Sequence, residues 1–233
     1  MKAIVLAAGC SSRMGQQKQL LIWQGKTLLQ HAIDKLNKAG FDVITVIGSA
    51  ADEIQQHISH TQVVVNEHWC EGMGSSIALA IKKLNFKDTA VLITQPDQVA
   101  LNSHDFLLLK SHSLRWPKKI ICSCFHGAIK GVIKGENNEF ITQKIISVPA
   151  IFPSEYFPEL MKLNKNNGAR KIIQQAMDEA EEDTTGQKVV AISLQNAAIN
   201  INTPDEWHYW QQSQNIDFSS DNLLFSKMEQ KET

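Results

Sequence analysis

A short apolar run lies directly before a loop of small residues at the start of the chain, and this junction limits the possible folds most. The run covers residues 3–8, and the loop that follows carries two cations, Arg13 and Lys18. A continuous apolar run of this length predicts a strand buried on both faces, as in a parallel sheet. Because Gly9 has no side chain, the backbone after this strand can approach a ligand closely.

This loop predicts a binding site for a polyphosphate. The backbone N–H groups from Gly9 to Gly15 can point at phosphate oxygens, and Arg13 and Lys18 supply fixed positive charge. The alternative is that both cations are solvated charges of an ordinary loop. The loop has neither the Gly-Lys-Ser/Thr of a P-loop nor a Gly-x-Gly-x-x-Gly fingerprint. It therefore indicates a nucleoside triphosphate site of another type.

Apolar runs alternate with helical patterns in the rest of the chain, which favours βαβ units around a mostly parallel sheet. Thr27 can cap the first helix and Gly40 can end it. The predicted strands are 3–8, 43–47, 62–65, 90–94, 119–123 and 189–194. The predicted helices are 28–38, 50–58, 75–84, 103–112, 156–163 and 169–178. Residues 128–134 and 140–146 predict a hairpin in addition.

Length and charge limit the class of protein. The 233 residues predict a single domain over 1–210 and a polar tail over 211–233. A net charge of −1 gives no reason to expect a nucleic-acid or membrane surface. The four cysteines have neither disulfide nor zinc spacing, and the eight histidines form no ligand cluster in sequence. No apolar segment is long enough for a membrane span or a signal peptide, so we expect a cytoplasmic protein.

Asp97 follows the predicted strand 90–94 and therefore lies at its carboxyl end. Ligands bind at that end of the strands in open α/β sheets. A single carboxylate there can hold Mg²⁺ together with triphosphate oxygens, because Mg²⁺ keeps several of its waters. The alternative is an N-cap role for the next helix, for which Asn102 and Ser103 are better placed. We therefore predict that Asp97 is a metal ligand.

Gly72-Met73-Gly74-Ser75-Ser76 opens a predicted helix, whose N-terminus favours anionic groups. A plain helix cap is the alternative, and Ser75 alone would suffice for it. Two glycines beside a methionine favour a binding role for Gly74, Ser75 and Ser76.

The first loop resembles the signature of the MobA-like nucleotidyltransferases, and within them most closely that of the molybdenum cofactor cytidylyltransferases. Segments 25–32, 66–76, 97–98, 168–170 and 201–204 follow in the family's order, so the resemblance extends to about residue 210. The matching residues of the first loop are Leu6, Ala7, Ala8, Gly9, Ser11, Arg13, Met14, Gly15, Lys18, Leu20 and Leu21.

The resemblance implies a three-layer α/β/α sandwich with a Rossmann-like sheet, of the nucleotide-diphospho-sugar transferase type. It implies Mg²⁺-dependent transfer of CMP from CTP to molybdopterin, and a molybdoenzyme or its maturation factor as a partner. The catalytic residues would be Arg13, Lys18 and Asp97, with Asp97 and Asn202 at the metal. The implied nucleotide-binding residues are Leu6, Ala7, Ala8, Gly9, Ser11, Ser12, Arg13, Gly15, Lys18, Gly74, Ser75 and Ser76.

Two of the places where the chain departs from the family pattern bear most on the site. Asn200 and Asn202 stand where the family has aspartates, and an amide oxygen binds Mg²⁺ more weakly because it carries no charge. The hairpin at 128–146 is longer than the family's usual connection and could reshape the acceptor side of the cleft. Arg170 could hold an acceptor phosphate or form a structural salt bridge.

The resemblance favours CTP over GTP, because guanylyl-transferring relatives usually have a glycine where Ala8 stands. Two other functions remain open. One is nucleotidyl transfer to a phosphorylated sugar or polyol. The other is a nucleotide-binding accessory protein that has lost catalysis through its asparagines.

Overall fold

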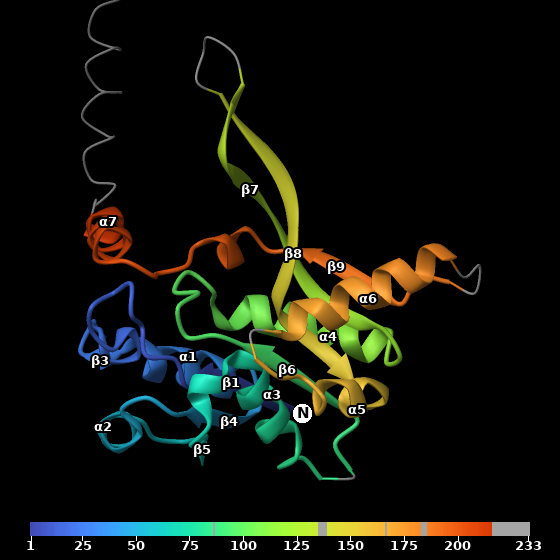
Figure 1. Cartoon of the computed structure of the whole chain (residues 1–233), viewed down its shortest axis with the longest axis horizontal. Helices are drawn as coiled ribbons and strands as arrows, with labels where there is room; N and C mark the ends of the chain where they lie inside the picture. Colours follow the sequence, from blue (N-terminus) through green and yellow to red (C-terminus); the bar gives the residue numbers. More distant parts are fainter. Residues whose placement is uncertain (86, 135–138, 166, 183–185, 216–233) are drawn as a thin grey trace, which may run out of the picture.

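The computed structural model describes residues 1–85, 87–134, 139–165, 167–182 and 186–215. Its centre is a seven-stranded sheet in the order β5-β4-β1-β6-β8-β7-β9 (Figure 1). Every neighbouring pair is parallel except the two that involve β8, which is antiparallel to β6 and to β7. The strands are β1 (Lys2–Ala7), β4 (Asp42–Ile47), β5 (Gln62–Val65), β6 (Ala90–Thr94), β7 (Ile120–Lys134), β8 (Glu139–Pro153) and β9 (Val189–Ser193).

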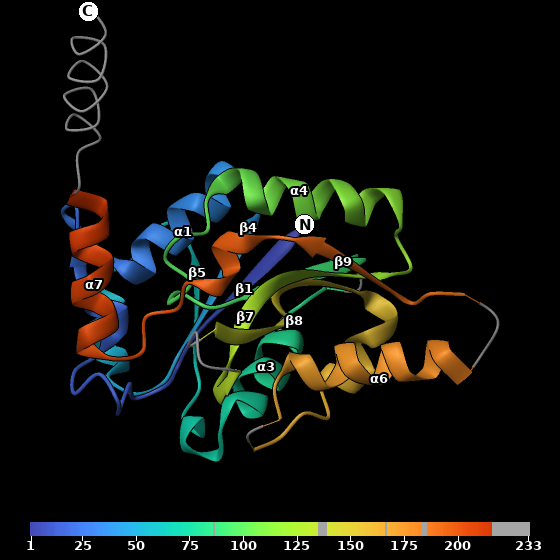
Figure 2. The same ribbon diagram turned by 90° about the horizontal axis from the view of Figure 1, so that it is seen from above.

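Helices cover both faces of this sheet, which confirms the predicted three-layer sandwich. Figure 2 shows α1 and α4 on one side of the strands and α3 and α6 on the other. Strand β1 supplies Ile4 and Leu6 to one hydrophobic cluster and Ala3 and Val5 to the other, so it is buried on both faces. The helices are α1 (Leu28–Lys38), α2 (Ala51–Gln56), α3 (Met73–Ile81), α4 (Ser103–Arg115), α5 (Phe157–Leu160), α6 (Ala169–Glu182) and α7 (Pro204–Asn215).

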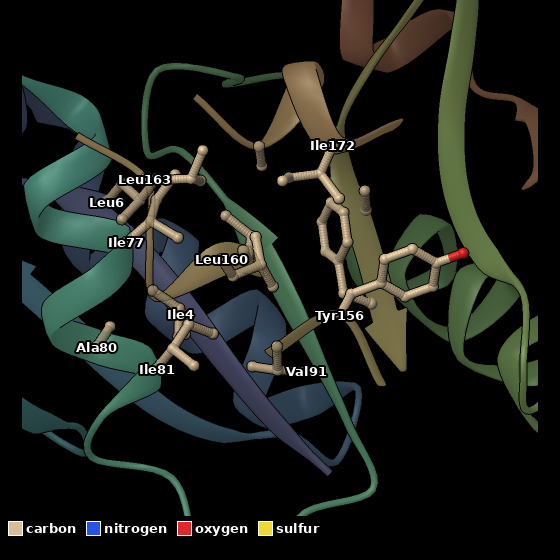
Figure 3. Packing of buried hydrophobic residues seen from close by; sticks show 14 of the residues in the cluster. Ile4, Leu6, Ile77, Ala80, Ile81, Val91, Tyr156, Leu160, Leu163 and Ile172 are labelled. Atoms are coloured by element: carbon tan, nitrogen blue, oxygen red, sulfur yellow. The ribbon is translucent and has the colours of Figure 1, made fainter. Parts of the chain in front are cut away.

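Close packing of aliphatic side chains fills the layer between the sheet and helices α3, α5 and α6. In Figure 3, Ile4 and Val91 from the sheet lie near Ile77 and Ile81 of α3, and Leu160 of α5 belongs to the same cluster. All five side chains are at most 3% exposed. This tight contact fixes the start of α3 close to the end of β1, where the predicted phosphate loop begins.

The predicted caps of α1 are confirmed. The Thr27 side chain accepts a hydrogen bond from the Gln30 backbone N–H, and Gly40 follows the helix with φ +72°. The Phe41 and Gly40 backbone N–H groups donate to the carbonyls of Leu36 and Asn37, the arrangement of a Schellman cap. The predicted bounds of this helix therefore match the observed ones.

The region after residue 119 corrects the prediction. We expected a short strand at 119–123 and a separate hairpin at 128–146, whereas β7 and β8 are single strands of 15 residues each. The arms extend away from the rest of the sheet (Figure 1). A register shift between Cys122 and Ser123 marks where the central sheet passes into the hairpin. Residues 135–138, at its predicted turn, lie outside the described residues.

Short elements complete the fold. The helix predicted at 156–163 is instead the 3₁₀ turn η3 (Ser154–Tyr156) followed by α5. The small strands β2 (Ile22–Trp23) and β3 (Lys26–Thr27) pair after the 3₁₀ turn η1 (Lys18–Leu20). Two more 3₁₀ turns, η2 (Trp69–Glu71) and η4 (Gln195–Ala198), precede α3 and α7.

Helix α7 packs on the segment that follows the phosphate loop. Trp207 and Trp210 contact a small cluster that includes Met14 and Ile201, and Trp207 meets Trp23 edge to face at 6.1 Å. The helix continues to Asn215, into the segment predicted as a tail. The domain boundary at 210 stays a prediction, and residues 216–233 lie outside the described residues. No helix in the described ranges is long and apolar enough to cross a membrane.

Candidate active site

The predicted loop and the predicted metal ligands meet in one cavity of about 330 Å³ at the carboxyl ends of β1 and β6. The cavity brings together eight of the predicted site residues: Leu6, Gly9, Ser11, Ser12, Arg13, Lys18, Asp97 and Asn202. Four further residues line it: Met73, which belongs to the predicted segment 72–76 but was not among the predicted site residues, and Gln19, Gln95 and Pro96, which the sequence did not indicate.

A compact turn shapes the loop after β1. The Met14 backbone N–H donates to the Ser11 carbonyl at 2.9 Å, and Ser11 has a positive φ of 53°. Gly15 closes the turn with φ +73°, a backbone conformation that favours glycine. Gln17 Nε2 then donates to Ser49 Oγ at 3.0 Å, which ties the loop to the residues after β4. The segment Gly-x-Ser-x-Arg-Met-Gly thus forms a turn that is hydrogen-bonded within itself and is followed by a bond to the residues after β4.

Lys18 lies at the centre of a polar cluster. Its Nζ donates to Asp97 Oδ2 at 2.5 Å and to Asn202 Oδ1 at 3.1 Å. Arg13 Nη2 donates to the same Asn202 oxygen at 3.2 Å. A lysine ammonium has three donors and an arginine five, so both cations keep N–H groups for an anionic ligand. Residues that are 79 and 184 positions from Lys18 in the chain therefore form one site with it.

The backbone around Asp97 explains why the carboxylate and Asn202 meet. The Ile201 N–H donates to the Asp97 carbonyl at 3.0 Å, so the next side chain of that segment, Asn202, faces Asp97. Gln98 Nε2 donates to the carbonyls of Val148 and Ala197, which fixes the turn after β6. The Asp97 side chain is consequently held in place from the strands and from the segment before α7.

Asp97 and Asn202 fit a hard divalent cation by their chemistry. Asp97 is 6% exposed, and its Oδ1 is buried without a hydrogen bond from any residue that the structure describes. A buried carboxylate oxygen without a partner is costly unless a cation compensates it. Carboxylate and amide oxygens are suitable Mg²⁺ ligands, and Mg²⁺ needs few of them from protein. Within the described ranges no group of three or more His, Cys, Asp or Glu side chains could hold a metal.

The two asparagines of the 200–204 segment have different surroundings. Asn200 Nδ2 donates to the carbonyls of Ala197 and Ala198, so it stabilises the local turn. Asn202 alone of the two lines the cavity. Its backbone N–H donates to a carboxylate oxygen of Glu206, which accepts a second bond from the Thr203 N–H. Glu206, which no sequence motif indicated, holds Asn202 through the first turn of α7.

Gly74, Ser75 and Ser76 lie outside the cavity that holds the loop. The Gly74 N–H donates to the Lys165 carbonyl, and a Cβ at Gly74 would lie 2.6 Å from the Asn164 nitrogen. The hydroxyls of both serines accept hydrogen bonds from Asn66 Nδ2 at 2.9 Å. Their nucleotide-binding role stays a prediction, and the contacts described here fix the start of α3.

Four further residues that the sequence analysis considered have these surroundings. Ala8 is 7% exposed and packs in the cluster beneath α3, with its Cβ 3.0 Å from where a Cβ of Gly48 would lie. Arg170 is exposed at the start of α6 and makes no ion pair within the described part of the chain. Cys122 and Cys124 are free thiols in β7, as their spacing indicated.

The protein has the nucleotide-diphospho-sugar transferase fold. Its features are a largely parallel sheet between helices, a loop with two cations after β1 and a carboxylate after β6. The sequence comparison names the family more closely. The chain belongs to the family of the MobA-like NTP transferase domain, whose model matches residues 3–181.

Individual relatives match over shorter stretches. The molybdenum cofactor cytidylyltransferase of Escherichia coli is 31% identical over 81 residues, 34% of this chain and 42% of that protein. The nicotine blue oxidoreductase of Paenarthrobacter nicotinovorans is 31% identical over 103 residues, 42% and 50% of the two chains. The bifunctional protein GlmU of Staphylococcus saprophyticus is 26% identical over 113 residues, which are 47% of this chain and 25% of that protein. The matches span half or less of these curated relatives.

Solved structures share the fold over nearly the whole chain. The crystal structure of Rv0371c from Mycobacterium tuberculosis in complex with manganese has a TM-score of 0.66 and 20% sequence identity. The alignment covers 91% of this chain and 98% of that one. At this identity the likeness supports the fold.

Proposed function

We propose that this protein is a metal-dependent nucleotidyltransferase that transfers CMP from CTP to molybdopterin and releases pyrophosphate. Family membership supports nucleotidyl transfer, and the resemblance of the first loop supports CTP and molybdopterin. The observation that carries the proposal is the cluster of Lys18, Asp97, Asn202 and Arg13 in one cavity at the strand ends.

The reaction joins two anions, so positioning and positive charge dominate its barrier. An acceptor phosphate oxygen attacks the α-phosphorus of CTP, the bond from that phosphorus to the bridging oxygen breaks, and pyrophosphate leaves with the electron pair. Lys18 keeps one N–H donor beyond its bonds to Asp97 and Asn202, and we assign it to the oxygens between α-phosphate and leaving group. We assign Arg13 to the leaving pyrophosphate.

Asp97 and Asn202 are the residues that would hold Mg²⁺. The bound ion would neutralise triphosphate charge in the transition state. Asn202 Oδ1 accepts from Lys18 and from Arg13, which engages both of its lone pairs, so it would have to give up one of these bonds to hold the ion. The base preference depends on the resemblance at Ala8, since the lining of the cavity includes Leu6 and Gly9 but not Ala8.

One observation favours a second candidate, a nucleotide-binding accessory protein without turnover. Asn202 brings no negative charge to the metal site, so Asp97 is the only carboxylate among the residues that line the described cavity. A weaker metal site would slow the transfer while leaving the loop able to bind nucleotide.

The test measures pyrophosphate release from CTP and Mg²⁺ with molybdopterin as acceptor, and with sugar and polyol phosphates in parallel. We expect release with molybdopterin, and none from an Asp97→Asn variant that remains folded. If pyrophosphate is released only with sugar or polyol phosphates, the acceptor is one of these compounds and not molybdopterin. Tight CTP binding without release from any acceptor would favour the accessory protein. Replacing CTP with GTP, ATP or UTP in the same assay tests the base preference.

A further inference from the structure

Gln19 is a buried glutamine beside the predicted catalytic lysine. It lies in η1 between Lys18 and Leu20 and is 2% exposed. Glutamine is mostly a surface residue, and a buried one must satisfy both its carbonyl oxygen and its NH₂ group. In this protein its hydrogen-bond partners are the last residue of β1 and two residues of the loop that follows.

The Gln19 amide joins the end of β1 to two points of the following loop. Nε2 donates to the Ala7 carbonyl at 2.9 Å and to the Gly9 carbonyl at 2.7 Å. Oε1 accepts from Ser11 Oγ at 3.0 Å. Ser11 Oγ in turn accepts from the Lys18 backbone N–H at 3.3 Å. One side chain therefore connects the end of β1, the following turn and the residue that carries the cation.

The Gln19 amide group occupies backbone carbonyls of this segment and none of its N–H groups. The Ala7 and Gly9 carbonyls accept from the Gln19 side chain, so they do not need an N–H group of the loop as a donor. Ser11 keeps a positive φ of 53°, which a non-glycine residue holds only when its surroundings fix it. A phosphate that meets preoriented N–H groups loses less free energy on ordering them.

We propose that Gln19 is a positioning residue that holds the loop in its triphosphate-binding form and sets Lys18 in register with it. The proposal rests on the proposed function, because it requires the loop to bind a nucleoside triphosphate. Gln19 lines the cavity, but its polar atoms are directed to the loop, so its effect passes through the loop backbone.

The test substitutes Gln19→Met, which keeps the length of the side chain and removes its donors and acceptor. Gln16→Leu is the matched control, since Gln16 is an exposed glutamine of the same loop with no side-chain hydrogen bond to any described residue. Binding of CTP and of CMP to the folded proteins is measured by calorimetry in the presence of Mg²⁺. Circular dichroism and thermal unfolding establish that each variant is folded.

We expect Gln19→Met to weaken CTP binding about 30-fold. This is the change in affinity that corresponds to the net contribution of two hydrogen bonds, which no longer hold the loop in its binding form. The loss for CMP should be at least fivefold smaller, because CMP lacks the two phosphates that extend along the loop. Gln16→Leu should bind both ligands like the wild type. A general structural defect would weaken both ligands alike, so the ratio of the two losses separates positioning from damage.

The proposal is overturned if folded Gln19→Met binds CTP within twofold of the wild type, or if CMP and CTP weaken equally. If Gln19→Met does not fold, Ser11→Ala takes its place, since it removes the bond to Oε1 and leaves the buried amide intact. We then expect an approximately fivefold loss for CTP, and an unchanged affinity overturns the proposal. A wild type that binds no nucleoside triphosphate overturns the proposed function and Gln19's role with it.

Discussion

Substituting Lys18→Met removes the cation from a carboxylate that is nearly out of contact with water. The two side chains are 19% and 8% exposed, and Nζ lies 2.5 Å from Asp97 Oδ2. At an effective dielectric constant of about 20, two charges at this distance attract with about 7 kcal/mol before desolvation is counted. Losing one partner of a buried pair costs about 3–5 kcal/mol, because the other charge stays buried.

We therefore expect the free energy of unfolding to fall by about 3 kcal/mol, the lower end of that range, because Lys18 is partly hydrated. For a protein of this size this corresponds to a Tm that is about 6–12 °C lower. The matched control is Lys26→Met, since Lys26 lies at the same 2.5 Å from Asp34 with side chains that are 55% and 33% exposed. A solvent-exposed pair of this kind contributes about 0–1 kcal/mol.

Urea denaturation followed by tryptophan fluorescence measures both variants and the double variant Lys18→Met/Asp97→Asn. The double variant should be more stable than Lys18→Met, because it removes the uncompensated carboxylate. Saturating Mg²⁺ should stabilise Lys18→Met more than the wild type, since the ion can replace the ammonium beside Asp97. Equal costs for Lys18→Met and Lys26→Met would refute the reasoning, because they would mean that water screens both pairs alike.

Other outcomes follow from the same site and from the core. Asn202→Asp should raise the affinity for Mn²⁺ about tenfold in electron paramagnetic resonance titrations, and an unchanged affinity would remove this residue from the metal. Arg13→Ala should lower kcat/KM in the pyrophosphate assay about 30- to 1000-fold, which corresponds to a loss of about 2–4 kcal/mol of transition-state stabilisation. A loss below threefold would argue against contact with the leaving group. Burial raises the pKa of the Cys122 thiol to about 12, so at pH 8 only about one in 10⁴ is thiolate. In native protein a disulfide reagent should therefore react with two thiols, those of the exposed Cys10 and Cys70. In denaturant it should react with all four. Rapid labelling of Cys122 in native protein would contradict this.

The fold could be predicted where local signals and tertiary contacts agree. Strand β1 is apolar from Ala3 to Ala7 because helices cover both of its faces, and that run is visible in the sequence. The limits of α1 follow from Thr27 and Gly40, whose effects are confined to a turn of chain. The loop, Lys18 and Asp97 could be located for the same reason, since each follows a recognisable strand.

The remaining features depend on partners that are distant in sequence. The long strands β7 and β8 are continuous because they pair with each other, and β7 also pairs with β9 about 70 residues later. Gln19 looks like any surface glutamine until the loop folds over it. Asn202 entered the predicted site through the family resemblance, and the bond that directs it there joins two backbone groups, Ile201 N–H and the Asp97 carbonyl. Side-chain patterns carry no information about such a bond.

Two glycines near the site allow packing and ligand binding to be separated. A Cβ at Gly74 would lie within 2.7 Å of three backbone atoms of Asn164, which have no flexible end that could move aside. A Cβ at Gly9 would meet nothing within 4 Å. Gly74→Ala should therefore lower the free energy of unfolding by about 1–3 kcal/mol, as overpacking does, whereas Gly9→Ala should change it by less than about 1 kcal/mol.

Nucleotide binding should respond in the opposite order. Gly9→Ala adds a methyl group where the loop backbone is expected to approach the phosphates, so CTP affinity should fall although stability is retained. Gly74→Ala, measured at a temperature where it is folded, should bind CTP like the wild type if this glycine serves to pack α3 against residue 164. A loss of CTP affinity in folded Gly74→Ala as large as that in Gly9→Ala would instead favour the nucleotide-binding role that the sequence predicted for the start of α3. That outcome would extend the binding site from the first loop to the N-terminus of α3.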